Sequence, residues 1–145
     1  TKDFQRMIKN MFGINTIMKR KLMNPNDLLN DTDITLSDLK ILFMVYYNTT
    51  LSVSQIGKET LISKPNCSKS INTLVKKGLI DRKHDEKDRR IIKVFLTEKG
   101  KSFVKKKNFE IIRHLQNQLE KLNEQDIELL NNATKDFYEI ISKLK

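Results

Sequence analysis

The sequence predicts a mainly α-helical fold with one small β-hairpin. Apolar residues recur at three- and four-residue steps through most of the chain, which is the spacing of amphipathic helices. One stretch departs from this spacing, where two short strand-like runs flank the charged segment 84–89. At 145 residues, with 4 glycines and 2 prolines, the chain suits one domain with helical extensions and no long disordered linker.

The first helix is expected over residues 2–23. Its apolar residues spread over more than one face, which is typical of a helix buried against two neighbours. Asn24 and Pro25 end this helix, because the residue before a proline is disfavoured in the α region. A polar connection is expected over residues 26–33.

Capping boxes predict the next two helix starts. The run 35–38 opens a strongly apolar helix over 36–47, with Asp in place of the usual Glu. The run 52–55 opens a short helix that ends near Thr60. This short helix and the helix that follows at Lys64 form a helix-turn-helix.

The helix expected over residues 64–77 has two unlike faces. Ser63 can cap it, Pro65 is tolerated in its first turn, and Gly78 closes it. At about 100° per residue, one face collects Cys67, Ser70, Ile71, Leu74 and Val75 and is a core stripe. The opposite face collects Pro65, Asn66, Lys69, Asn72, Thr73 and Lys76.

The polar face of this helix carries cations, amides and a hydroxyl, but no carboxylate. Asn can address an adenine edge, and Lys can address a guanine edge or a phosphate. The alternative is an ordinary solvated helix face with surplus lysines. The neighbouring hairpin favours the nucleic-acid interpretation.

The hairpin is expected from strands 79–83 and 90–96, joined by the charged tip 84–89. Thr97 then opens a long helix that ends near Leu122. Helix, hairpin, helix is the layout of a winged helix-turn-helix, in which the hairpin is the wing.

A heptad seam is predicted in the last helix, which the run 123–126 caps. Its members, at steps of 3, 4, 3, 4 and 3, are Ile127, Leu130, Thr134, Phe137, Ile141 and Leu144. The seam is too short for a free coiled coil, so this helix must pair with other helices.

Positive charge is concentrated in the same region. The chain has 28 Lys and Arg against 18 Asp and Glu, a net charge of +10. Residues 63–93 hold ten of the cations and four of the acids, so this segment alone carries +6. Charge concentrated on a helix and a hairpin favours a nucleic-acid partner.

No enzyme, cofactor or metal site is expected. His84 and His114 have no plausible catalytic triad around them, and there is no glycine-rich phosphate loop. The wing acids alternate with cations, which favours salt bridges over a metal. A single cysteine, Cys67, excludes an intrachain disulfide and lies on the core face, so packing is favoured over redox sensing.

A cytoplasmic protein without a membrane partner is expected. The longest apolar run, 41–47, is too short to span a bilayer, and the start TKDFQRMIKN lacks a signal-peptide core. A chain with a single cysteine, which can form no intrachain disulfide, also suits the reducing cytoplasm.

The wing resembles that of the MarR family of bacterial regulators. D-R-R at 88–90, an apolar strand and L-T-E-K-G at 96–100 match the family pattern of D-x-R, strand and L-T-x-x-G. S-Q-I-G-K at 54–58 lies where the family has its first helix-turn-helix helix, and the resemblance spans about residues 36–144. One departure is Lys87, which stands where family wings often have a first arginine.

The resemblance implies a sequence-specific transcriptional regulator that binds double-stranded DNA. It would act as a homodimer on a pseudo-palindromic site, with dimerisation helices in 1–34 and 99–145 and a DNA-binding lobe in 35–98. Asp88 would steer Arg90 toward the minor groove, and a small-molecule effector would bind between the two regions. The residues predicted to contact DNA are Ser63, Lys64, Asn66, Lys69, Asn72, Thr73, Lys76, Asp88, Arg89 and Arg90.

Three other classes stay open from the residues alone. They are a low-specificity architectural DNA-binding protein, a winged-helix module that binds protein, and a basic peripheral membrane protein that uses the lysine-rich stretch 99–113. The carboxylate-free helix face argues against the second class, and the third lacks a strongly apolar interfacial face.

Overall fold

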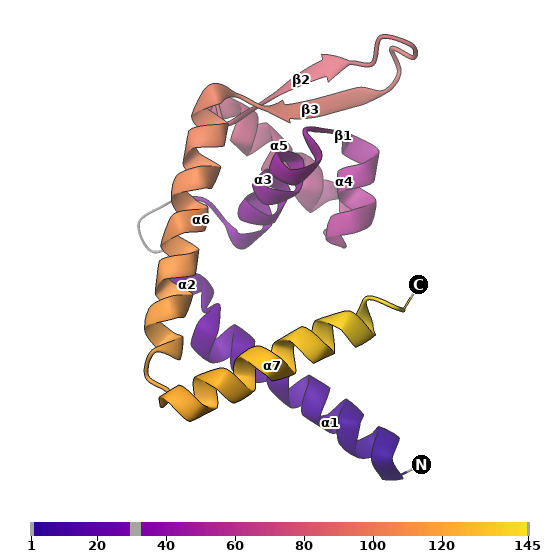
Figure 1. Cartoon of the computed structure of the whole chain (residues 1–145). Helices are drawn as coiled ribbons and strands as arrows, with labels where there is room; N and C mark the ends of the chain where they lie inside the picture. Colours follow the sequence, from indigo (N-terminus) through magenta and orange to yellow (C-terminus); the bar gives the residue numbers. More distant parts are fainter. Residues whose placement is uncertain (1, 30–32, 145) are drawn as a thin grey trace. The chain divides into compact units, whose positions relative to one another are not determined.

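The computed structural model of the chain describes residues 2–29 and 33–144. They divide into a larger unit, residues 24–110, and a smaller unit formed by residues 1–23 and 111–145. In chain order the elements are α1 (Lys2–Ile17), the π-helical segment η1 (Met18–Leu22), α2 (Pro25–Leu29), α3 (Leu36–Asn48), β1 (Thr50–Ser52), α4 (Val53–Thr60), α5 (Lys64–Lys76), β2 (Ile80–His84), β3 (Ile92–Leu96), α6 (Glu98–Leu119) and α7 (Glu124–Ile141) (Figure 1).

The predicted fold class, a mainly helical chain with a small β wing, is confirmed. The larger unit holds one antiparallel sheet with the strand order β1-β3-β2, and β2 and β3 form the predicted hairpin. The sheet has one strand that the sequence did not predict, since β1 pairs Leu51 with Val94 of β3. Three residues between two helices are too few to show a strand period, so only the pairing partner defines β1.

The strand and loop boundaries also differ from prediction. β3 begins at Ile92 rather than at Arg90, because residues 88–91 form a turn in which Ile91 N donates to Asp88 O at 3.0 Å. The connection predicted over 26–33 contains the short helix α2, whose Leu28 is buried. The rest of that connection, residues 30–32, lies outside the described residues.

The core of the larger unit lies between α3, α5 and the sheet. Its fully buried side chains are Ile41, Leu42, Val45, Ile56, Ile71, Leu74, Ile80, Val94 and Val104.

Both predicted capping boxes are present. Thr35 Oγ1 accepts from Asp38 N at 3.1 Å while Thr35 N donates to the Asp38 carboxylate, which satisfies the buried Asp38 side chain. Ser52 and Gln55 make the same exchange at the start of α4.

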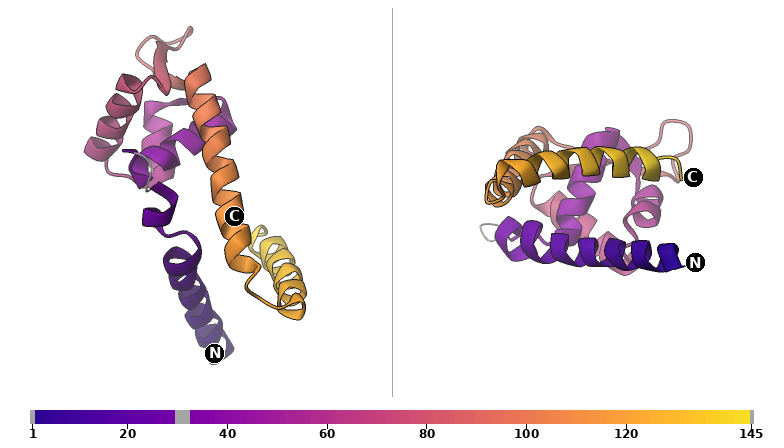
Figure 2. Two further views of the ribbon diagram at one scale, coloured as in Figure 1. Left: turned by 90° about the vertical axis from the view of Figure 1, so that its left-hand side faces the viewer. Right: turned by 60° about the horizontal axis from the view of Figure 1, so that its bottom comes forward.

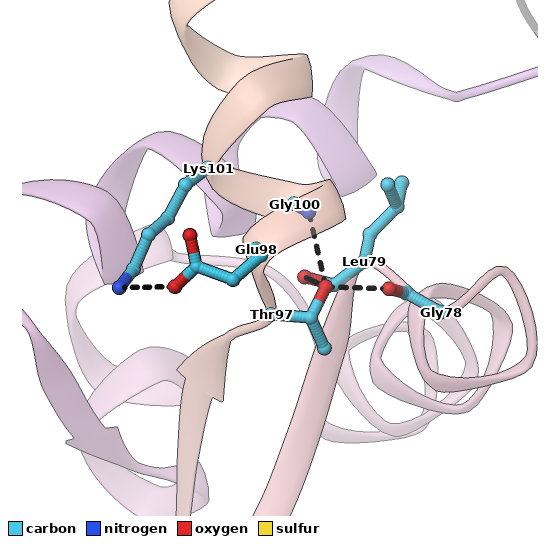
Figure 3. Close-up of polar contacts among 6 residues, drawn as sticks. All are labelled: Gly78, Leu79, Thr97, Glu98, Gly100 and Lys101. Atoms are coloured by element: carbon cyan, nitrogen blue, oxygen red, sulfur yellow. Dashed lines mark hydrogen bonds and ion pairs between the residues drawn. The ribbon is translucent and has the colours of Figure 1, made fainter.

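The L-T-E-K-G run builds a tight joint at the base of the wing (Figure 3). The Thr97 hydroxyl donates to the carbonyl of Gly78 at 2.6 Å and accepts from Gly100 N at 3.0 Å. Gly78 has φ +71°, so it closes α5 in the left-handed conformation, as predicted. Gly100 is buried, and a Cβ built there would lie 1.9 Å from the carbonyl oxygen of Leu79. The motif therefore joins the end of α5, the start of β2 and the start of α6.

A buried cation fastens α6 within the larger unit. Lys107 is 5% exposed, and its Nζ donates to the carbonyl of Leu28 at 2.9 Å. The same ammonium lies 3.1 Å from Glu110 Oε2, so its charge is paired. This contact holds α6 against the C-terminal end of α2.

In the smaller unit, α1 and η1 form the helix predicted over 2–23, with its last turn π-helical. The expectation that this helix is buried is wrong for the single chain: the apolar side chains of α1 are exposed, including Phe12 at 70%. The turn between α6 and α7 can be followed in Figure 2. At the start of α7, Asn123 Oδ1 accepts from Asp126 N at 2.8 Å, as predicted for the cap. Most of the predicted seam of α7 is exposed as well; Phe137, for example, is 48% exposed.

Candidate nucleic-acid interface

Helix α5 buries one face in the core and exposes the opposite face, as predicted. Cys67, Ser70, Ile71 and Leu74 are buried, and Val75 is half-buried. The opposite side chains Asn66, Lys69, Asn72 and Lys76 are exposed, while Thr73 is half-buried. Ser63 caps the helix, since its Oγ accepts from Asn66 N at 3.4 Å. The exposed face is a row of amides and ammonium groups without an acid.

Cys67 is a packing residue in this arrangement. Its side chain is 2% exposed, and burial raises the pKa of its thiol. A raised pKa lowers the thiolate fraction at neutral pH, so the thiol is a poor nucleophile. The structure thus agrees with the sequence interpretation of Cys67 as a core residue.

The wing presents one arginine in a defined orientation. Arg90 Nε and Nη2 donate to the two carboxylate oxygens of Asp88, each at 3.0 Å, and Arg90 N donates to Asp88 Oδ1 at 3.1 Å. The side-chain hydrogen bond from Arg90, and then its backbone hydrogen bond, lower the pKa of Asp88, while Asp88 raises the pKa of Arg90. Both groups are therefore ionised at neutral pH. The Arg90 side chain is 91% exposed, so the fork is held in solvent.

Other polar groups of the wing form a salt bridge and a hydrogen bond near its tip. Lys93 Nζ lies 3.4 Å from Asp85 Oδ1, which agrees with the predicted salt bridging of the wing acids. His84 Nδ1 donates to the carbonyl of Arg89 at 2.8 Å, so one ring nitrogen of His84 is used inside the hairpin. The side chain of Arg89 is exposed. Within the described residues, no group of three or more His, Cys, Asp or Glu could hold a metal ion.

A groove joins α4, the N-terminal end of α5 and the wing. Its volume is about 750 Å³, and its lining includes Lys58, Lys64 and Arg90. No carboxylate is present among the described lining residues, whereas Ser52, Ser54 and Ser68 contribute hydroxyls. Two predicted contact residues, Lys64 and Arg90, are thus brought together around one electropositive groove that suits anionic groups.

One polar contact joins the wing to α5 and was missed by the sequence reasoning. Arg82 Nη2 on β2 donates to Asn72 Oδ1 on α5. The alternation of side chains along a strand could have predicted this contact. It puts Arg82 on the same face as the buried Ile80, toward the helix. At the C-terminal end of α5, Lys77 pairs with Asp33, and this hydrogen-bonded ion pair lowers the pKa of Asp33.

His114 is the second histidine and lies on α6, in the smaller unit. It is half-buried rather than a free surface residue, and its Nε2 is buried without a hydrogen-bond partner among the described residues.

Of the helices that the structure describes, none has the length and apolar character needed to cross a membrane.

Comparisons with known proteins agree with this geometry. Residues 32–91 match the model of the MarR family. A curated Bacillus subtilis (strain 168) protein, the uncharacterized HTH-type transcriptional regulator YfiV, is 35% identical over 69 residues. That stretch is 48% of this chain and 43% of the relative, so the chain matches less than half of that protein's length.

Solved structures show the same fold. Wild-type MarR of E. coli in its apo form has a TM-score of 0.77 at 21% identity, over 86% of this chain and 92% of that one. A MarR family protein from Bacillus stearothermophilus has a TM-score of 0.78 at 17% identity, over 96% and 98% of the chains. Streptococcus pneumoniae FabT, solved in complex with DNA, has a TM-score of 0.66 at 22% identity, over 98% and 99%.

Proposed function

We propose that this chain, whose residues 32–91 match the model of the MarR family, is a winged helix-turn-helix regulator of that family. It would regulate transcription by binding double-stranded operator DNA as a homodimer. The similarity to a family of regulators also agrees with the prediction that the chain is not an enzyme. A similar fold, FabT of Streptococcus pneumoniae, was solved in complex with DNA, which supports a DNA partner here. Binding would take place in the cytoplasm.

The observation that carries the proposal is the exposed face of α5. It offers Lys69, Asn72 and Lys76 without a carboxylate, beside a wing whose Arg90 is aimed by Asp88. In a winged helix-turn-helix such a helix enters the major groove, and the wing reaches the neighbouring minor groove. Contacts to phosphates would supply most of the affinity, and contacts to base edges would supply the sequence preference.

The proposal is tested by binding to random and selected duplexes. The purified chain should retain a fraction of a random duplex pool, and repeated selection should converge on a pseudo-palindrome with two half-sites. Binding without convergence would favour the low-specificity architectural class. No retention of duplex at moderate salt would contradict DNA binding and leave the protein-binding module as the better description.

Asn72 and Lys76 should separate base reading from phosphate contact. Residues in the middle of a recognition helix meet base edges, while its far end meets backbone. Asn72→Ala is expected to cost about 1–3 kcal/mol on the selected site and to relax one base position. Lys76→Ala should weaken all sequences alike and lower the salt slope by about one. The measurement is affinity for selected and scrambled duplexes across a salt series, and equal losses on every sequence would exclude Asn72 as a base reader.

A homodimer is expected because the smaller unit exposes two apolar stripes. Phe12 and Ile14 of α1 are 70% and 51% exposed, and the α7 residues Leu130 and Phe137 are 39% and 48% exposed. Large apolar patches are rare on soluble monomers, so we infer that a partner covers these stripes. Light scattering at micromolar concentration should therefore give the mass of a dimer.

A pair of adjacent substitutions tests the route of dimerisation. Phe137→Glu puts a charge in the seam and should give mainly monomer, because a buried unpaired carboxylate is costly. Tyr138→Glu changes the next residue, which is 75% exposed and outside the seam, and should affect the dimer much less. A wild-type monomer, or equal effects of the two substitutions, would contradict the seam as the interface.

A small-molecule effector stays a prediction from the family resemblance. That resemblance places the effector between the dimerisation helices and the DNA-binding lobe, whereas the groove beside α5, which has the volume of a small-ligand site, is lined by residues of the lobe alone. An occupant there would lie against Lys64 and Arg90, which we assign to DNA contact, and would therefore compete with DNA.

A further inference from the structure

We propose that Arg82 sets the base preference of this protein by holding the amide of Asn72 in one orientation, so that the pair offers hydrogen-bond donors and selects guanine. The inference rests on the proposed DNA-binding function and deepens it. It starts from the contact in which Arg82 Nη2 donates to Asn72 Oδ1.

The orientation of the Asn72 amide follows from the chemistry of its partner. A guanidinium has five N–H donors and no acceptor, so only the oxygen of an amide can face it. The amide oxygen of Asn72 is therefore turned toward β2, and the amide nitrogen is left as the group available to a ligand. Both side chains are exposed, so the pair lies at the surface that would face a duplex.

Arg82 is anchored by the strand that carries it. Its backbone is paired in register with Val94 of β3, and Arg82 N donates to Asp81 Oδ1 at 2.8 Å. The alternation of β2 turns Arg82 toward the same side as the buried Ile80. Helix α5 lies on that side, since Arg82 reaches Asn72 there. The wing therefore orients a side chain of the recognition helix, in addition to making its own contact with the minor groove.

A donor-only pair favours one base edge in the major groove. Guanine presents two acceptors there, O6 and N7, whereas adenine presents the N7 acceptor beside the N6 amino donor. A free asparagine prefers adenine because its oxygen accepts from N6 while its nitrogen donates to N7. In Asn72 the oxygen already accepts from Arg82, and the guanidinium beside it repels an amino donor. The sequence-level expectation of an adenine contact thus changes to guanine.

The test compares four duplexes that differ only at one base pair of the selected site. That position is the one whose preference disappears in Asn72→Ala. Wild type should prefer guanine over adenine there by about tenfold, within the range of one good side-chain to base pairing. Arg82→Met removes the donors but keeps a long side chain, and should abolish this preference or shift it to adenine.

Lys83→Met is the matched control. Lys83 is the neighbouring cation of β2, and its Nζ lies 5.3 Å from the centre of the Phe95 ring, away from Asn72. This substitution removes the same charge and should weaken all four duplexes alike while the guanine preference stays. Thermal unfolding of both variants should match wild type, since both side chains are exposed.

The outcomes separate the inference from the function on which it depends. If Arg82→Met keeps the wild-type preference, or if wild type prefers adenine at this position, the role of Arg82 is overturned while DNA recognition stands. If Asn72→Ala changes no base position, the inference fails because Asn72 reads no base. If selection yields no preferred sequence, the proposed regulator function fails together with the inference.

Discussion

Gly100→Ala is expected to destabilise the protein by about 3 kcal/mol, at the upper end of the cost of overpacking a core. A Cβ at this position would lie 1.9 Å from Leu79 O and 2.9 Å from Leu79 C, far inside van der Waals contact. Both atoms belong to the backbone, so no flexible side chain can move to make room. The first turn of α6 would have to shift away from Leu79, and the hydrogen bond from Gly100 N to Thr97 would be disturbed.

Gly57→Ala is the matched control in the same unit. Gly57 lies inside α4, and a Cβ there would meet nothing within 4 Å. Alanine in a helix interior is favoured over glycine by about 1 kcal/mol. The free energy of unfolding in urea should therefore rise for Gly57→Ala and fall for Gly100→Ala. Equal stabilities would show that α6 does not approach Leu79 as closely as described.

Arg90→Ala is expected to lower affinity for the selected duplex by about tenfold or more, with little change in the free energy of unfolding. The substitution removes a charge-bearing fork that Asp88 holds in place and that is 91% exposed. Preorganisation of this kind removes part of the entropy cost of binding. The measurement is fluorescence anisotropy at moderate salt, and unchanged affinity would contradict the winged-helix mode of binding.

Asp88→Ala isolates the contribution of orientation. This change removes a negative charge from the wing, which by itself should strengthen binding to DNA. If Asp88 aims Arg90, affinity should fall instead, by less than in Arg90→Ala. Lys87→Ala, which removes one exposed cation from the same tip, serves as a charge control and should cost less than Arg90→Ala. Stronger binding of Asp88→Ala would exclude the steering role.

Local chemistry was predicted well from the sequence. Thr35, Ser52 and Asn123 cap their helices as expected, because a cap needs only residues three positions apart. Gly78 likewise closes α5. The pairing of Asp88 with Arg90 is also local, and the structure has it as predicted.

The features that the sequence missed depend on distant partners. β1 exists because Leu51 pairs with Val94, and no pattern in three residues reveals such a partner. The contact between Arg82 and Asn72 requires the strand and the helix to be packed, although the two residues are ten positions apart. The burial expected for α1 concerns surface that the single chain leaves exposed, and the proposed homodimer would cover it.

The joint around Thr97 has a mechanical consequence. One hydroxyl bonds both the end of α5 and the first turn of α6, and Gly100 leaves no gap against the start of β2. Close-packed parts transmit strain instead of absorbing it. The recognition helix and the wing should therefore move together as one rigid body when the first turn of α6 tilts. The distance between the recognition helix and the wing is then fixed. A duplex whose major and minor grooves are spaced differently must bend in order to contact both elements.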